Sequence, residues 1–296
     1  MIRIWAIAGL ASFLWSGALL WSGGIGPASA AREADWTQLV RPFRIAPGIY
    51  YVGTRGLAAY LVTSKQGAIL FDGTLEENAP LIERNIETIV PLNRVKLILS
   101  DHAHYDHVGA VARIKADTGA RFVASTGDAV ALRRGMPRGD TDYTAIGFTP
   151  IKIDQVISDG QSVAVGDAVL TAHLTPGHTP GCTSWSTTVR DGDRRFRVLF
   201  LCSLTVAGNV LVGNRAYPAI GADYENTFAR LSGMKADIVL TSHPEMADVL
   251  GREARVEAGD RRAFIDPTAL PSIVARSRAA FEMALAIARR APRAVP

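Results

Sequence analysis

The sequence predicts an α/β fold in which two β-rich halves pack as a sandwich with helices on the outer faces. Short apolar segments typical of strands recur along the chain between glycine-containing turns. Strands followed by helices occur twice, on either side of a polar, Gly- and Pro-containing stretch at residues 135–150. The 296 residues can bury a large core, and the charged residues are spread along the chain, so no nucleic-acid partner is expected.

The first half is predicted to be a meander of short strands, followed by alternating helices and strands. The expected strands are residues 43–45, 49–52, 57–62, 68–71, 95–99 and 121–124. Leu81, Ile82, Ile86 and Ile89 repeat at helical spacing and predict an amphipathic helix over residues 78–90. Two more helices are expected over residues 108–118 and 126–134.

The second half repeats this theme after the loop-like stretch. The expected strands are residues 151–153, 161–165, 168–174, 196–201 and 237–241. The segment 271–290 is rich in Ala and Arg and is expected to be a packing helix with a solvated basic face. We therefore predict a single domain over residues 31–296, made of two halves joined near residues 135–150.

The first thirty residues have the features of a secretory signal peptide. Arg3 precedes an apolar run, which is followed by Gly and Pro and then by Ala28-Ser29-Ala30. Cleavage after Ala30 would deliver a periplasmic protein with no stable membrane association. The alternative is an uncleaved membrane anchor, since the apolar run is close to the shortest that can span a bilayer.

The two cysteines, Cys182 and Cys202, flank an expected hairpin with its turn near Asp191-Gly192. Pairing outward from that turn brings Cys182 opposite Leu201, one position away from Cys202. Adjacent strand positions of this kind give poor disulfide geometry. A disulfide and two buried thiols therefore both remain open.

The chemistry of the chain is concentrated after the strand at residues 95–99. His102, His104, Asp106 and His107 lie within six positions, and the whole chain has only six histidines. A core gains nothing from packing several titratable rings together, whereas imidazole and carboxylate are ligand types that suit zinc. Because the group follows a buried strand, it is expected at the end of a sheet, where open α/β folds place their sites.

Two further histidines also follow strands. His178 is flanked on both sides by Gly and Pro, which fix the backbone and so aim the ring. His243 follows the expected strand at residues 237–241, with Ser242 between them. His173 falls inside a strand and is interpreted as structural. Asp72 ends another strand, where a simple turn role and a role in supporting the histidine segment are both open.

The motif His102-Ala103-His104-Tyr105-Asp106-His107 matches the His-x-His-x-Asp-His signature of the metallo-β-lactamase superfamily, and the segments around His178 and His243 follow in the expected order. Many members place a bridging aspartate after the strand at 196–201, where this chain has Ser203. An intact signature with serine there resembles the third subclass of class B β-lactamases. Cys202 is one residue out of register with a cysteine ligand and is expected in the core.

This resemblance implies an αβ/βα sandwich with two central sheets and a centre of two zinc ions. His102, His104 and His178 would hold one ion, and Asp106, His107 and His243 would hold the other. A metal-bound hydroxide oriented by Asp106 would hydrolyse the β-lactam amide and confer resistance, including to carbapenems, with Asp106 and His243 catalytic. Other implied roles are substrate contacts by Ser203, Thr205 and Asn209, and support of the centre by Asp72.

Two alternative functions are also considered. The first is a dinuclear-zinc lactonase or thioesterase of the same superfamily, which the absence of the bridging aspartate disfavours. The second is a zinc-binding periplasmic protein without turnover. The expected partner is a small-molecule β-lactam substrate, and the expected state is a monomer.

Overall fold

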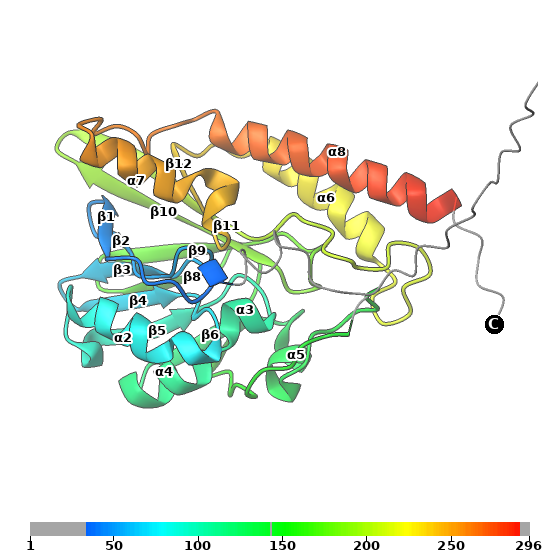
Figure 1. Cartoon of the computed structure of the whole chain (residues 1–296), viewed down its shortest axis with the longest axis horizontal. Helices are drawn as coiled ribbons and strands as arrows, with labels where there is room; N and C mark the ends of the chain where they lie inside the picture. Colours follow the sequence, from blue (N-terminus) through cyan, green and yellow to red (C-terminus); the bar gives the residue numbers. More distant parts are fainter. Residues whose placement is uncertain (1–33, 143, 291–296) are drawn as a thin grey trace, which may run out of the picture.

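The computed structural model describes residues 34–142 and 144–290, and the predicted signal peptide lies outside these residues. Two β-sheets pack face to face, with helices on both outer sides (Figure 1). The predicted αβ/βα sandwich is therefore confirmed. In the described part of the chain, no helix is long and apolar enough to cross a membrane.

The first sheet has seven strands in the order in which they occur along the chain. They are β1 (Phe43–Ala46), β2 (Ile49–Tyr51), β3 (Tyr60–Ser64), β4 (Gly67–Phe71), β5 (Val95–Leu99), β6 (Arg121–Ser125) and β7 (Gln155–Ile157). Pairing is antiparallel from β1 to β4 and parallel from β4 to β7. The parallel strands bring their carboxyl ends to one edge of the sheet.

The second sheet has five strands in the order β12-β11-β10-β9-β8. They are β8 (Ser162–Val165), β9 (Ala168–Leu174), β10 (Thr183–Asp191), β11 (Arg194–Leu201) and β12 (Ile238–Thr241). Only β11 and β12 run parallel, so the segments that follow them also emerge at a common edge.

The helices divide between the two outer faces (Figure 1). The first sheet is covered by α2 (Ala79–Glu87), α4 (Val111–Thr118) and α5 (Ala129–Arg134), and the second by α6 (Ile220–Ser232), α7 (Val249–Glu257) and α8 (Ala269–Arg290). Alternation along β4 shows why the sheet needs cover on both faces. Ile69 and Phe71 belong to the core between the sheets, whereas Ala68 and Leu70 pack on the helix side.

Aromatic residues join the two sheets at the centre of the sandwich. The rings of Phe71 and Phe200 stack with centroids 4.9 Å apart. The buried hydroxyl of Tyr60 donates a hydrogen bond of 2.7 Å to the carbonyl of Thr241, at the end of β12. These contacts fix the edge of one sheet against the edge of the other, which is where the predicted site residues lie.

Several predicted boundaries differ from the structure. The expected strand at 151–153 is extended chain that runs beside α5, where the N–H of Ile151 donates to the carbonyl of Leu132. The last strand of the first sheet is β7, so the chain changes sheets after Ile157 rather than within 135–150. The helix expected from Val108 begins three residues earlier, as the short α3 (Tyr105–Val108).

The structure resolves the question of the cysteines, because Cys182 and Cys202 form a disulfide with Cα atoms 5.9 Å apart. The predicted register was wrong by two residues. Asp191 pairs with Arg194, so the hairpin turn is Gly192-Asp193. Both cysteines lie just outside the regular ladder of β10 and β11, where their backbones are free to approach each other.

Replacing both cysteines by alanine is expected to lower the free energy of unfolding by about 3 kcal/mol, because the bond closes a loop with a sequence separation of 20 residues. Urea unfolding of the double variant and of the parent, each with and without reductant, measures the effect. Reductant should destabilise only the parent. An unchanged midpoint in the double variant would contradict the expectation.

Candidate metal centre

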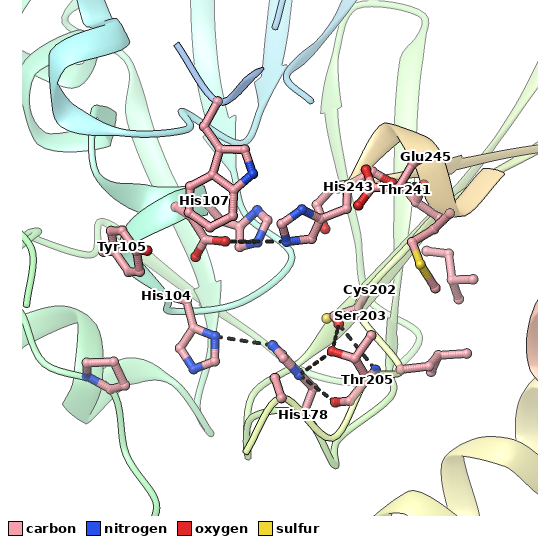
Figure 2. Close-up of a pocket in the computed structure, with 18 of the residues that line it drawn as sticks. His104, Tyr105, His107, His178, Cys202, Ser203, Thr205, Thr241, His243 and Glu245 are labelled. Carbon is pink, nitrogen blue, oxygen red and sulfur yellow. Dashed lines mark hydrogen bonds and ion pairs between the residues drawn. The ribbon is translucent and has the colours of Figure 1, made fainter. Parts of the chain in front are cut away.

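Six side chains converge at the common edge of the two sheets. Figure 2 labels His104, His107, His178 and His243 among them. His102 and His104 lie in the loop after β5, and α3 presents Asp106 and His107 directly afterwards. His178, from the loop between β9 and β10, and His243, directly after β12, approach from the second sheet. The structure thus brings together every metal ligand that the sequence predicted, from segments separated by more than a hundred residues.

Three histidines form the first cluster. His102 Nε2 lies 3.0 Å from His104 Nδ1, and His178 Nε2 lies 3.1 Å from each of them. The three rings are steeply inclined to one another, so the nitrogens face a common point. Zinc–imidazole bonds of about 2.0–2.1 Å in a tetrahedral arrangement separate the nitrogens by ~3.3–3.4 Å, close to what is seen here.

The opposite ring nitrogens decide which atoms carry protons. His102 Nδ1 lies 2.8 Å from Asp101 Oδ1, and His178 Nδ1 lies 2.7 Å from the carbonyl oxygen of Thr205. Both partners only accept hydrogen bonds, so both Nδ1 atoms carry the proton and both Nε2 atoms present lone pairs. Two lone pairs aimed at each other 3.1 Å apart are repulsive unless a cation lies between them. The donor set therefore fits a metal ion.

Asp106, His107 and His243 form the second cluster. Asp106 Oδ2 lies 3.2 Å from His107 Nε2 and 3.3 Å from His243 Nε2. The clusters are adjacent, since the rings of His102 and His107 have centroids only 4.3 Å apart. A carboxylate with two imidazoles is again a ligand set that suits zinc.

Burial controls the charge of the first cluster. It lowers the pKa of His102, His104 and His178 to about 3 in each case. All three rings are therefore neutral at pH 7, the form that binds a metal ion.

More carboxylates surround the second cluster than the first. Burial alone would lower the pKa of His107, but the carboxylates of Asp106, Asp101 and Asp72 outweigh it and raise that pKa to about 10. Burial alone would raise the pKa of Asp106, but His107 and His243 beside it hold it well below its usual range. The site attracts positive charge, either as protons or as a metal ion.

Asp72 lies beside this cluster, directly after the end of β4. It is fully buried, and its Oδ1 accepts a 3.0 Å hydrogen bond from the N–H of Asp101. Its Oδ2 lies 3.9 Å from His107 Nδ1. Asp72 adopts φ 61°, a strained value for a residue with a side chain, and the next N–H, of Gly73, donates to the carbonyl of His107.

A cavity of about 570 Å³ opens onto both clusters, a size typical of small-molecule sites. Ser203 and Thr205 line it, with their hydroxyl oxygens 3.0 Å apart. Asn209 is placed differently: its Nδ2 donates to the carbonyls of His178 and Val206, and it is not among the described residues that line the cavity. The substrate roles of Ser203, Thr205 and Asn209 stay predictions.

Trp36 was not recognised as a site residue from the sequence. Its ring lies 6.0 Å from that of His243 and 6.2 Å from that of Tyr105, and it forms part of the cavity wall. It reaches the site from the start of the described chain, before β1, where no motif marks it. Asp101 directly precedes the His102–His107 motif, but its contact with His102 Nδ1 was not anticipated.

His173 lies outside both clusters, as its position within β9 predicted. Its Nε2 is 2.7 Å from Ser186 Oγ, and its Nδ1 is 3.4 Å from a guanidinium nitrogen of Arg230. These are contacts to the neighbouring strand and to α6.

Fold and site together define a metal-binding hydrolase of the αβ/βα class. The family model of the metallo-β-lactamase superfamily matches residues 52–243, more than half of the chain. The chain belongs to this superfamily, and similar solved structures fall within its subclass B3.

One similar structure is BJP-1, a subclass B3 metallo-β-lactamase of Bradyrhizobium japonicum, with 40% sequence identity and a TM-score of 0.83 over 88% of this chain and 98% of that one. A metallo-β-lactamase of Cronobacter sakazakii is 41% identical, with a TM-score of 0.82 over 88% and 99% of the two chains. FEZ-1 of Legionella gormanii is 33% identical, with a TM-score of 0.81 over 86% and 98%.

Curated relatives are more distant and more varied. A hydroxyacylglutathione hydrolase of Rhodospirillum rubrum is 36% identical over 84 residues, and a type A flavoprotein of Rhodobacter capsulatus is 24% identical over 204 residues. The matched parts span only 26% and 43% of those proteins. These partial matches to proteins with different names do not fix one reaction.

Loss of a residue that only hydrogen-bonds to a metal ligand typically lowers metal affinity 10- to 100-fold. Because His102 is itself a predicted ligand, replacing it by alanine is expected to lower the zinc affinity of the first cluster by more than this. His173→Ala is the matched control and should bind zinc as the parent does. Metal analysis after dialysis, with titration against a chromogenic chelator, measures both. Equal zinc binding by the parent and His102→Ala would contradict the assignment.

Proposed function

We propose that the protein hydrolyses the amide bond of β-lactams, carbapenems included, at a centre of two zinc ions, and that it thereby confers β-lactam resistance. The observation that carries the proposal is the pair of adjacent three-ligand clusters opening onto one cavity. Sequence identities of 40% to a subclass B3 metallo-β-lactamase and 41% to another metallo-β-lactamase, over nearly their whole length, support it.

We assign each residue a role from its position in the site. His102, His104 and His178 would hold one zinc ion, and Asp106, His107 and His243 the other. Bound zinc supplies Lewis acidity, which polarises a carbonyl and lowers the pKa of water. Asp106 uses Oδ2 toward the two histidines, so its Oδ1 is the atom that would accept a hydrogen bond from the attacking water and orient it.

The cavity wall would hold the rest of the substrate. The hydroxyls of Ser203 and Thr205 are hydrogen-bonded to each other at 3.0 Å, and both would turn their donors toward a substrate carboxylate. No lysine or arginine is found among the described residues that line the cavity, so hydroxyl groups are the donors on that wall. Trp36, Ile146 and Met246 add apolar surface for the body of a small molecule.

Export to the periplasm is part of the proposal. The leader-like residues 1–30 support it, and so does the Cys182–Cys202 disulfide, because such bonds persist in oxidising compartments. We propose that the mature protein begins at Ala31 and acts as a monomer without stable membrane association.

Lactone or thioester hydrolysis is the second candidate, supported by the match to a hydroxyacylglutathione hydrolase. Ser203 at the position where many such enzymes carry a bridging aspartate argues against it. Zinc binding without turnover is the third. A panel of β-lactams, lactones and thioesters separates the three candidates.

Protein beginning at Ala31 is expected to open the ring of a carbapenem and of a cephalosporin, with the activity abolished by chelator and restored by added zinc. Absorbance loss at the β-lactam band measures turnover, and metal analysis should find about two zinc ions per chain. Two bound zinc ions with hydrolysis of lactones or thioesters only would transfer the function to the second candidate.

The double variant Ser203→Ala/Thr205→Ala is expected to raise KM for β-lactams by about 10- to 100-fold with little change in kcat, since two hydrogen bonds to a charged group are lost in ground state and transition state alike. The Thr205 carbonyl that holds His178 is kept, so zinc content should not change. Unchanged KM would remove these hydroxyls from the substrate site.

A further inference from the structure

Asp128 connects the two loops that supply the first cluster, although it contacts none of the ligand side chains. It lies between β6 and α5 and is only 3% exposed. Its Oδ2 accepts hydrogen bonds of 2.9 Å from the N–H of Ala103 and from Thr179 Oγ1, and its Oδ1 accepts one of 2.9 Å from the N–H of Gly181.

The three donors belong to the two loops that carry the histidines of the first cluster. Ala103 lies between His102 and His104, and Thr179 directly follows His178. One buried carboxylate therefore fixes the backbone of the His102–His104 segment to the backbone of the His178 segment. Hydrogen bonds to an ionised acceptor are about twice as strong as neutral ones.

The packing around Asp128 leaves little room for these loops to shift. Ser125 Oγ donates a 2.7 Å hydrogen bond to the carbonyl of Gly181. A Cβ atom on Gly181 would lie 2.5 Å from that hydroxyl oxygen, and one on Gly127 would lie 2.5 Å from the carbonyl carbon of Pro180. Glycine is needed at both positions because the two backbones meet directly.

We propose that Asp128 is a positioning residue that sets the spacing between the His102–His104 pair and His178, and thereby the affinity of the three-histidine cluster for its metal ion. The inference rests on the proposed zinc binding and not on the identity of the organic substrate. Asp106, His107 and His243 reach the centre through other contacts, so the second cluster should depend much less on Asp128.

Only an acceptor-only group satisfies the three donors. An asparagine at position 128 has nearly the same shape, but it offers one acceptor oxygen and directs an NH₂ group at one of the N–H donors. Thr179 gives an independent matched pair, because Thr179→Ser keeps the hydroxyl and Thr179→Val removes it at similar volume. Asp154 is the control carboxylate, since its Oδ2 accepts the N–H of Phe122 at the other end of β6.

The test is metal titration of full-length mature protein stripped of metal, with Zn²⁺ in competition with a chromogenic chelator and with Co²⁺ followed by its visible spectrum to assign each site. For Asp128→Asn we expect at least a tenfold loss of affinity at the three-histidine site and a change of less than about threefold at the other. Thr179→Val should shift affinity in the same direction, while Thr179→Ser and Asp154→Asn should match the parent.

Equal affinities at both sites in Asp128→Asn and in the parent would overturn the proposal. Equal losses at both sites, or the same loss in Asp154→Asn, would also overturn it, because they indicate a general effect on folding. If Asp128→Asn does not fold, the Thr179 pair decides, and indistinguishable Val and Ser variants refute the role. A site-selective loss in a protein that hydrolyses no β-lactam would support the inference and reject the proposed function.

Discussion

The rest of the structure depends on holding three imidazole nitrogens 3.0–3.1 Å apart in a buried place. The lone pairs of His102 Nε2 and His178 Nε2 point at each other there, which is unfavourable without a cation between them. The surrounding chain supplies the restraint. Asp101 and the Thr205 carbonyl fix two of the rings in one tautomer, and backbone contacts at the ends of the strands fix the loops.

Buried carboxylates set the charge of the centre. Asp72, Asp101, Asp106 and Asp128 are each at most 8% exposed. Burying an ionised carboxylate costs several kcal/mol unless donors or opposite charges compensate. Asp128 is compensated by three hydrogen bonds, whereas Asp72, Asp101 and Asp106 surround His107 and raise its pKa. The second cluster is therefore built to hold positive charge, while the first is a set of neutral donors.

The sequence predicted the sandwich and the six side chains that converge at its edge because the relevant signals are local. A buried strand followed by polar residues identifies a sheet end, and His102 to His107 lie within a single short segment. The roles of Asp128 and Trp36 could not be predicted in this way. Asp128 depends on contacts with Thr179 and Gly181, more than fifty positions away, and its own segment looks like an ordinary helix start. The hairpin register failed because one misplaced turn residue shifts every pair along the strands.

The segment after β11 joins the metal centre to the cavity wall. It begins at Cys202, which the disulfide ties to Cys182. The carbonyl oxygen of Thr205 accepts hydrogen bonds from His178 Nδ1 at 2.7 Å and from the hydroxyl of Tyr224 at 2.6 Å, so both of its lone pairs are used. The side chains of Ser203 and Thr205 face the cavity from the same few residues. Because one backbone carries both functions, the hydroxyl groups on the wall cannot move relative to the cluster without breaking the bond that orients His178.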